Sequence, residues 1–240
     1  VEDYQNLWGD VETFETHIAR IDAILRYYFP QKNIGIVIDE WGMRHPEATA
    51  DNGFEQPNTL RDALLAGSLL NLFNRWAHRL SMATIAHTIN TLQCMAMTRG
   101  NRLFLTPTYH TFELMRPHMG ARRVLQEVEA PAPPRKESEK TPKIIEDLDV
   151  SASISGKKLH LTVINRSITE DITTQIQLRE VRTAAVSGKV LTAPRLQSTN
   201  SFDHPTAVSA RRIKIENASG DNVAHVFPCH SLTALTFSLE

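Results

Sequence analysis

The sequence predicts a mixed α/β region followed by an all-β region, and three features of the chain indicate this. The first half alternates helix-like and strand-like segments, the pattern typical of parallel β-α-β units. Residues 127–143, EVEAPAPPRKESEKTPK, hold four prolines and alternating charges, so we expect an exposed connection there. After it, short runs alternate apolar and polar residues between Gly, Asn and Ser, as in an antiparallel sandwich.

The first expected helix covers residues 11–29 and ends before Pro30. Its apolar residues recur at helical spacing: Phe14, Ile18, Ile21, Leu25 and Tyr28. A strand over residues 34–38 follows, and it consists of β-branched or small residues without polar alternation. We therefore expect this strand to be buried on both faces, as strands of parallel sheets are.

A second helix is expected within residues 58–79, after a polar loop. Asn58 or Thr59 can cap its first turn, and Asp62 in that turn interacts favourably with the helix dipole. Another apolar segment, residues 81–87, then completes a strand-helix-strand unit. A complete (β/α)₈ barrel needs roughly 250 residues, so most of a barrel would be missing from this chain.

Composition and charge exclude several classes of function. The 240 residues have a formal net charge of −1, which gives no sign of a nucleic-acid or membrane-surface partner. The ten histidines lack the spacing of a zinc site, and we expect neither a metal nor an organic cofactor. The chain opens without methionine or a signal-peptide pattern, so it reads as the middle of a longer protein. Any export signal would lie upstream, and we expect a cytoplasmic rather than a secreted protein.

Two adjacent carboxylates end the first expected strand, in IGIVIDEWGM at residues 34–43. In parallel α/β proteins, catalytic groups lie just beyond the carboxyl ends of strands, where Asp39 and Glu40 fall. Neighbouring strand residues point to opposite sides, so these two cannot form a facing acid/base pair. A catalytic carboxylate here would need its partner from another strand. The alternative is a structural pair of carboxylates that anchors a loop.

Several separated blocks of this sequence resemble glycoside hydrolase family 51, the α-L-arabinofuranosidases, in the family's order. The blocks in the first half are VIDEWGM, the expected second helix with its continuation to TINTLQ, and LFLTPTYHTFELMRPHMG. NSFDHPTAVSA and FPCHSLTALTFSLE resemble the family's carboxyl-terminal tail. The resemblance implies that residues 1–122 are the last part of a (β/α)₈ TIM barrel. It also implies that residues 123–240 form an antiparallel β-sandwich.

The same resemblance implies a retaining glycosidase that removes terminal arabinofuranosyl units from arabinan or arabinoxylan-type glycans. Its nucleophile would be Glu40, which would form a covalent arabinosyl–enzyme that water then hydrolyses. In the family the general acid/base is a Glu that follows an Asn, well before the nucleophile. No Asn-Glu pair precedes Glu40 here, so we expect the acid/base to lie outside these 240 residues.

Three further residues are expected to bind substrate. Trp41 would offer apolar surface to the sugar, or would instead pack behind the strand. His87 occupies a position where the family usually has Gln, and it could donate one hydrogen bond to the substrate. Asn90 matches the family pattern and would contact substrate or hold the loop by hydrogen bonds. Arg44 departs from the family, since many relatives have an aromatic residue there.

Other functions remain open on the sequence alone. The chain could be a carbohydrate-binding remnant without catalysis, or one piece of a barrel that a partner chain completes. Open sheet edges and apolar helix faces would favour such a partner. A family member with altered specificity for another glycoside is a third possibility. We expect an arabinose-containing oligo- or polysaccharide as ligand, with no nucleic-acid or membrane partner. A homo-oligomer is a further alternative.

Overall fold

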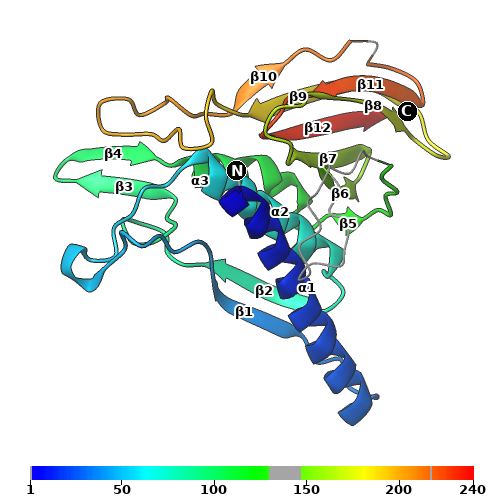
Figure 1. Ribbon diagram of the computed structural model, residues 1–240. Coiled ribbons are helices and arrows are strands. Elements are labelled where there is room, and N and C mark those ends of the chain that lie inside the picture. Colours follow the sequence, from blue (N-terminus) through cyan, green and yellow to red (C-terminus); the bar gives the residue numbers. More distant parts are fainter. Residues whose placement is uncertain (1, 130–146, 217) are drawn as a thin grey trace.

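The computed structural model of the protein describes residues 2–129, 147–216 and 218–240 (Figure 1). The segment before residue 122 contains α1 (Glu2–Tyr28), β1 (Ile36–Trp41), α2 (Leu60–Arg75), β2 (Leu80–Ile85), the hairpin β3 (Ala96–Arg99) and β4 (Arg102–Leu105), and α3 (Pro107–Met115). Two 3₁₀ turns, Ala50–Asn52 and Arg116–His118, lie in its loops. Within the described ranges, none of the helices combines the length and the apolar character that crossing a membrane requires.

The strands β1 and β2 form a parallel pair connected by α2. Ile36 lies opposite Leu80 at one end and Trp41 opposite Ile85 at the other. This arrangement confirms the expected β-α-β unit. Among the described residues, no other strand pairs with the outer edge of either β1 or β2.

The exposed face of this pair corrects one expectation. Val37 of β1 and Met82 of β2 each keep 51% of their surface exposed, although we expected the strand over residues 34–38 to be buried on both faces. One face packs on the core through Ile36 and Trp41, while no described element covers the other.

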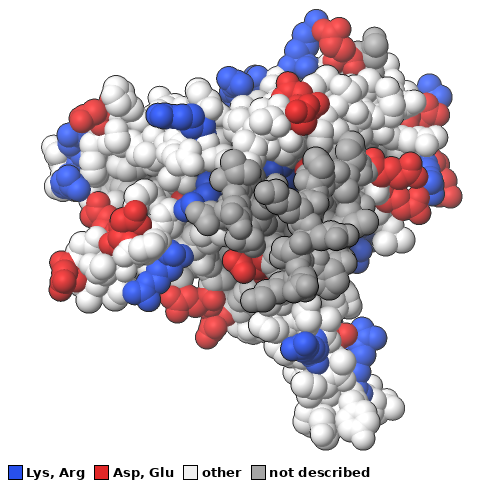
Figure 2. Space-filling view, viewed as in Figure 1, with Lys and Arg blue, Asp and Glu red and all other residues white. Residues whose placement is uncertain are grey.

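Helix α1 begins at Glu2, nine positions before the start that the sequence predicted. Trp8 and Val11 are buried and extend the apolar stripe toward the amino terminus. The other end of the helix projects from the body of the molecule and its tip is largely uncharged (Figures 1 and 2). The side chains of Ile24, Tyr27 and Tyr28 there are 55–78% exposed.

Helix α2 lies between the parallel pair and the β-rich region (Figure 1). Thr59 caps it: its hydroxyl accepts from the Asp62 backbone amide, and the Asp62 carboxylate accepts from Thr59. This capping box agrees with one of the two expected caps and satisfies backbone donors of the first turn. One apolar cluster joins the elements that α2 contacts, with Trp41 of β1, Leu64 of α2 and Ile164 of the sandwich among its members.

The β-rich region confirms the expected antiparallel sandwich. A six-stranded sheet has the order β10 (Arg211–Ile213), β9 (Thr183–Leu191), β12 (Ser231–Leu239), β7 (Lys158–Asn165), β6 (Leu148–Ser155) and β5 (Arg122–Arg123). Strands β8 (Ile172–Gln177) and β11 (Asn222–Phe227) form a separate pair. A second apolar cluster, which includes Leu148, Val223, Phe227, Leu235 and Phe237, joins the two sheets.

The expected boundary between the two regions falls inside strand β5. Arg122 and Arg123 both pair with β6 of the six-stranded sheet. Most of the proline-rich connection expected at residues 127–143 lies outside the described residues. The division at 122/123 stays a prediction about domains, while the sheet itself begins at Arg122.

Candidate functional site

Glu40 and His87 meet at the carboxyl end of the parallel pair. Glu40 is the next-to-last residue of β1, and His87 comes two residues after the end of β2. His87 Nε2 lies 3.9 Å from Glu40 Oε1, and the two side chains are 57% and 64% exposed. The Ala86 amide donates to the Trp41 carbonyl at 2.9 Å and so holds the two strand ends together. Glu40 and His87, two of the four expected site residues, therefore lie next to each other and are both exposed.

Asp39 contributes its backbone rather than its carboxylate to the described contacts. The Thr84 hydroxyl of β2 donates a hydrogen bond to the Asp39 carbonyl. Asp39 and Glu40 are both exposed, and among the described residues His87 is the one ion-pair partner of Glu40 within 4.0 Å. The Glu40 carboxylate is thus largely open to solvent, and no Lys or Arg of the described residues lies within 4.0 Å of it.

Trp41 lies in the core below the site. Its side chain is 4% exposed and packs edge-on against Phe73 at 5.3 Å and stacked on Phe112 at 5.9 Å between ring centroids. So little exposed indole surface leaves little for a sugar to contact. Of the two roles expected for Trp41, packing behind the strand is the one that its position supports.

Asn90 is engaged within its own loop. Its Nδ2 donates to Thr98 Oγ1 at 2.9 Å, and its Oδ1 accepts from the Thr98 amide at 2.6 Å. Its φ of 63° lies in the left-handed region, which Asn tolerates better than most residues. These contacts favour the structural role for Asn90 over direct substrate contact.

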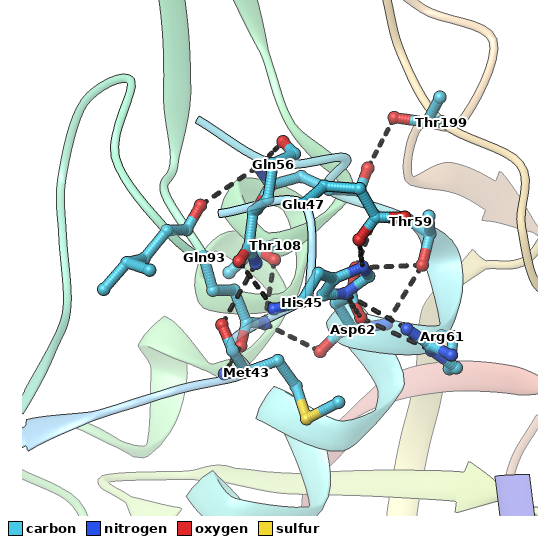
Figure 3. Close-up of polar contacts among 12 residues, drawn as sticks. Met43, His45, Glu47, Gln56, Thr59, Arg61, Asp62, Gln93, Thr108 and Thr199 are labelled. Carbon is cyan, nitrogen blue, oxygen red and sulfur yellow. Dashed lines mark hydrogen bonds and ion pairs between the residues drawn. The ribbon is translucent and has the colours of Figure 1, made fainter. Parts of the chain in front are cut away.

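The buried side chain of Gln93 holds the turn that follows Glu40 (Figure 3). Its Oε1 accepts from the Met43 amide at 2.7 Å, while its Nε2 donates to the Asp62 carbonyl and to Thr108 Oγ1. Gly42 precedes this contact with a φ of 140°, where a side chain would be strained and would press on Gln93. Gln93 thereby connects the end of β1 to the first turns of α2 and α3.

A second set of contacts fixes the loop to the start of α2 (Figure 3). The His45 amide donates to Gln56 Oε1 at 2.9 Å, and His45 Nε2 lies 2.9 Å from the buried Asp62 Oδ1. Arg61 Nη2 lies 3.1 Å from the same imidazole nitrogen. Asp62 Oδ2 meanwhile accepts from the Thr59 amide, so one carboxylate caps the helix and also contacts the loop.

The sequence predicted only part of this support. Asp62 was expected from its place in the first helical turn, but its contact with His45 had no local signal, since 17 positions separate the residues. Gln93 lies 50 positions from Met43 and likewise follows no recognised motif. These residues hold the loop after β1 through long-range contacts that a single sequence does not reveal.

Arg44 and Phe54 form the outer part of the same loop. The Arg44 guanidinium lies 5.5 Å from the centre of the Phe54 ring, within the range of a cation–π contact. Arg44 Nη2 also donates to the Ala48 carbonyl at 3.4 Å. The position where many family members have an aromatic residue thus holds a cation with an aromatic ring against it.

Comparisons with known proteins give consistent results. A family model described as alpha-L-arabinofuranosidase C-terminal domain matches residues 39–231. An intracellular exo-alpha-L-arabinofuranosidase of Bacteroides ovatus is 28% identical over 239 residues, which cover 98% of this chain and 45% of that protein. A probable alpha-L-arabinofuranosidase C of Aspergillus niger is 29% identical and matches 85% of this chain and 40% of its own length.

Solved structures give the same result. The family 51 arabinofuranosidase of Xanthomonas axonopodis pv. citri superposes with a TM-score of 0.86 at 29% identity, covering 96% of this chain and 46% of that one. An alpha-L-arabinofuranosidase from Thermotoga maritima, solved as an arabinose complex, has a TM-score of 0.81 at 22% identity and shares the fold. It matches 98% of this chain and 50% of its own. The chain spans about half the length of the relatives it matches. It belongs to the α-L-arabinofuranosidase C-terminal domain family, as a carboxyl-terminal portion of glycoside hydrolase family 51.

Proposed function

We propose that this chain is part of a retaining α-L-arabinofuranosidase in which Glu40 is the nucleophile. The substrates would be terminal arabinofuranosyl units of arabinan or arabinoxylan-type glycans. The observation that supports this most directly is the exposed Glu40 carboxylate at the carboxyl end of a parallel strand, in a chain of this family. A fixed loop behind it, held by Gln93 and Asp62, keeps the carboxylate on a rigid element.

The proposed reaction needs a second carboxyl group. Glu40 attacks the anomeric carbon while a protonated carboxyl gives its proton to the leaving glycosidic oxygen. The same group then takes a proton from water, which attacks the anomeric carbon and releases Glu40. The two carboxyls of a retaining enzyme lie about 5 Å apart. We place the second one on a barrel segment upstream of this chain.

The uncovered surfaces of the chain support an upstream barrel segment. The outer edges of β1 and β2 have no partner among the described residues, and such edges pair readily with further strands. Val37 and Met82 of these strands and Ile24 of α1 are each 51–55% exposed. The remaining β-α units of a (β/α)₈ barrel would cover these apolar groups, whether they belong to the same polypeptide or to a partner chain.

Two further expectations follow this proposal. His87, 3.9 Å from Glu40, is placed to donate a hydrogen bond to a substrate hydroxyl. His87→Gln, which introduces the residue usual at this position in the family, should alter the pH profile or weaken substrate binding. We also propose a cytoplasmic location, in keeping with the relative from Bacteroides ovatus that is named as intracellular.

The test is Glu40→Ala in the complete barrel, meaning this chain together with its upstream segment. We expect hydrolysis of an aryl α-L-arabinofuranoside to fall by about a thousandfold or more, with the fold retained by circular dichroism. The neighbouring Asp39→Asn is the matched control and should remain within about tenfold of the parent. Near-parental turnover by a well-folded Glu40→Ala protein would overturn the assignment. Proton NMR of the first product formed should show retained anomeric configuration.

A carbohydrate-binding remnant without catalysis is the second candidate. Native mass spectrometry separates the two. A bound second polypeptide, or a longer single chain, would support the enzyme. A species of 27.0 kDa or its multiples that binds arabinosides without turnover would support the remnant.

A further inference from the structure

A cavity of about 580 Å³ lies beside the loops that support Glu40. One wall is the loop after β1, which contributes Glu47 and Glu55, and a second is the β3–β4 hairpin with Arg99. Thr199–Phe202, on the connection between β9 and β10 of the sandwich, form the third. Its volume falls within the range of ligand sites, which often form where two structural regions meet. None of the roles described above uses this cavity.

The walls of the cavity are held by buried polar contacts. Asn200 Nδ2 donates to the Leu105 carbonyl at 2.8 Å, and its Oδ1 accepts from the Val208 amide at 2.7 Å. The Thr199 hydroxyl donates to the Asn58 carbonyl, which joins the sandwich to the loop after β1. These polar groups are engaged in hydrogen bonds within the protein, so the walls of the cavity are formed before a ligand binds.

The charged groups of the lining remain open to solvent. The carboxylates of Glu47 and Glu55 are 62% and 48% exposed, and the Arg99 guanidinium is 72% exposed. Arg99 lies 3.5 Å from Glu55 and 5.2 Å from the centre of the Phe202 ring. Two carboxylates that accept hydrogen bonds, a guanidinium that donates them and an aromatic ring therefore line the same cavity. Two carboxylates against one guanidinium also disfavour an anionic ligand.

We propose that this cavity is a glycan-binding site separate from the position of Glu40. A neutral sugar chain has the required chemistry, because its hydroxyls both donate and accept while its C–H faces pack on aromatic rings. The cavity is built from the same loops that follow β1 and β2, so it opens on the catalytic side of the chain. The proposal rests on the proposed function: the occupant would be the polysaccharide that carries the arabinofuranosyl unit.

The experiment measures binding and turnover separately. Binding of linear arabinan oligosaccharides to the complete barrel with Glu40→Ala is followed by calorimetry, with Arg99→Ala and Glu55→Gln added singly. We expect each to weaken binding about tenfold, the effect of losing a hydrogen bond to a charged group. Arg179→Ala is the matched control, because it breaks the exposed Arg179–Glu127 pair elsewhere on the sandwich. It should leave binding as it is.

Turnover in the Glu40-containing enzyme gives the second measurement. The ratio of kcat/KM on arabinan to kcat/KM on an aryl arabinofuranoside should fall severalfold in Arg99→Ala and Glu55→Gln. Unchanged binding and an unchanged ratio in both variants would overturn the glycan site. So would binding of a second copy of the chain at the cavity, detected as a dimer that Arg99→Ala dissociates. A parent without hydrolysis that still binds through Arg99 would contradict the proposed enzyme and leave the glycan site supported.

Discussion

Among single residues, His118 shows how burial sets the chemistry of a side chain far from the site. Its side chain is 8% exposed, and its two ring nitrogens lie 2.7 Å from Ser153 Oγ and 3.1 Å from Thr162 Oγ1. Burial, aided by the nearby His160, lowers the pKa of His118 to about 4. The imidazole is therefore neutral in the folded protein at pH values where an unfolded chain would begin to protonate it.

This shift predicts a loss of stability in mild acid. Between pH 6.5 and pH 4 the unfolded chain binds a proton at His118 that the folded protein excludes, so the free energy of unfolding falls as pH decreases. The full loss would be up to about 3 kcal/mol. Urea unfolding at several pH values should show a weaker pH dependence for His118→Gln than for the parent. The exposed His17→Gln should keep the parent slope, and equal slopes in all three proteins would contradict the prediction.

The sequence allowed some residues of the candidate site to be predicted and not others. Glu40 could be placed at the end of the strand because the end of an apolar strand is a local feature, while its role as nucleophile stays a prediction. The burial of Trp41 could not, because it depends on Phe73 and Phe112, which are 32 and 71 positions away. Asn90 also matched the family, yet its side-chain amide is hydrogen-bonded to Thr98. A motif identifies the residue, whereas its role depends on distant neighbours.

Among the elements, helix α2 packs closely against the sandwich at Gly67. A Cβ atom at this position would lie 2.7 Å from Leu232 Cδ1 and 2.8 Å from Ile164 Cδ1. Leu232 and Ile164 are themselves fully buried in the sandwich, so neither can move away at little cost. The helix thus approaches the six-stranded sheet at a distance that only glycine allows.

Gly67→Ala should therefore destabilise the protein, although alanine is the better helix former. We expect the free energy of unfolding to fall by about 1–3 kcal/mol, the usual cost of overpacking. Gly9 of α1 is the matched control, because no heavy atom lies within 4 Å of its added Cβ. Gly9→Ala should be neutral or stabilising by up to about 1 kcal/mol. Denaturant unfolding of both variants tests the difference, and a stabilised Gly67→Ala would refute the packing argument.

The elements themselves were largely predictable from the sequence. Periodicity and caps located α2, because Thr59 and Asp62 act within one turn. The start of α1 was placed too late, since Trp8, which precedes the expected start, is buried by tertiary packing rather than marked by a cap. The exposure of Val37 and Met82 could not be foreseen either, because burial depends on tertiary neighbours rather than on the local apolar pattern.

At the scale of the whole molecule, a buried ionic group joins the helical region to the sandwich. Asp149 of β6 lies 2.8 Å from Arg75 Nη1 of α2 and 3.0 Å from Arg166 Nη2. Burial alone would raise the pKa of Asp149, but Arg166 and Arg75 outweigh it and hold the pKa below its ordinary value. Asn71 of α2 adds a hydrogen bond to the Asp149 carbonyl at 3.1 Å.

Asp149→Asn should weaken this connection strongly. The change leaves two partly buried guanidinium groups without their carboxylate, and breaking a buried pair in this way costs about 3–5 kcal/mol. Glu127→Gln is the control, since its pair with Arg179 is exposed and worth at most about 1 kcal/mol. Thermal unfolding should show a large decrease in Tm for Asp149→Asn and little change for Glu127→Gln. Similar Tm values for the two variants would contradict a joining role.

The placement of α2 between two sheets has a consequence for protein engineering. Its side chains complete the hydrophobic interior under β1 and β2, and they also cover the sandwich at Ile164 and Leu232. Consider a chimera that joins the sandwich of one family member to the preceding α/β region of another at the proline-rich connection. Its α2 and its sandwich would come from different proteins, so the side chains of their common apolar cluster would not match. Exchange of the sandwich should succeed only when α2 and its contact residues are transferred with it. The unit that can be exchanged between family members therefore includes α2 as well as the sandwich strands.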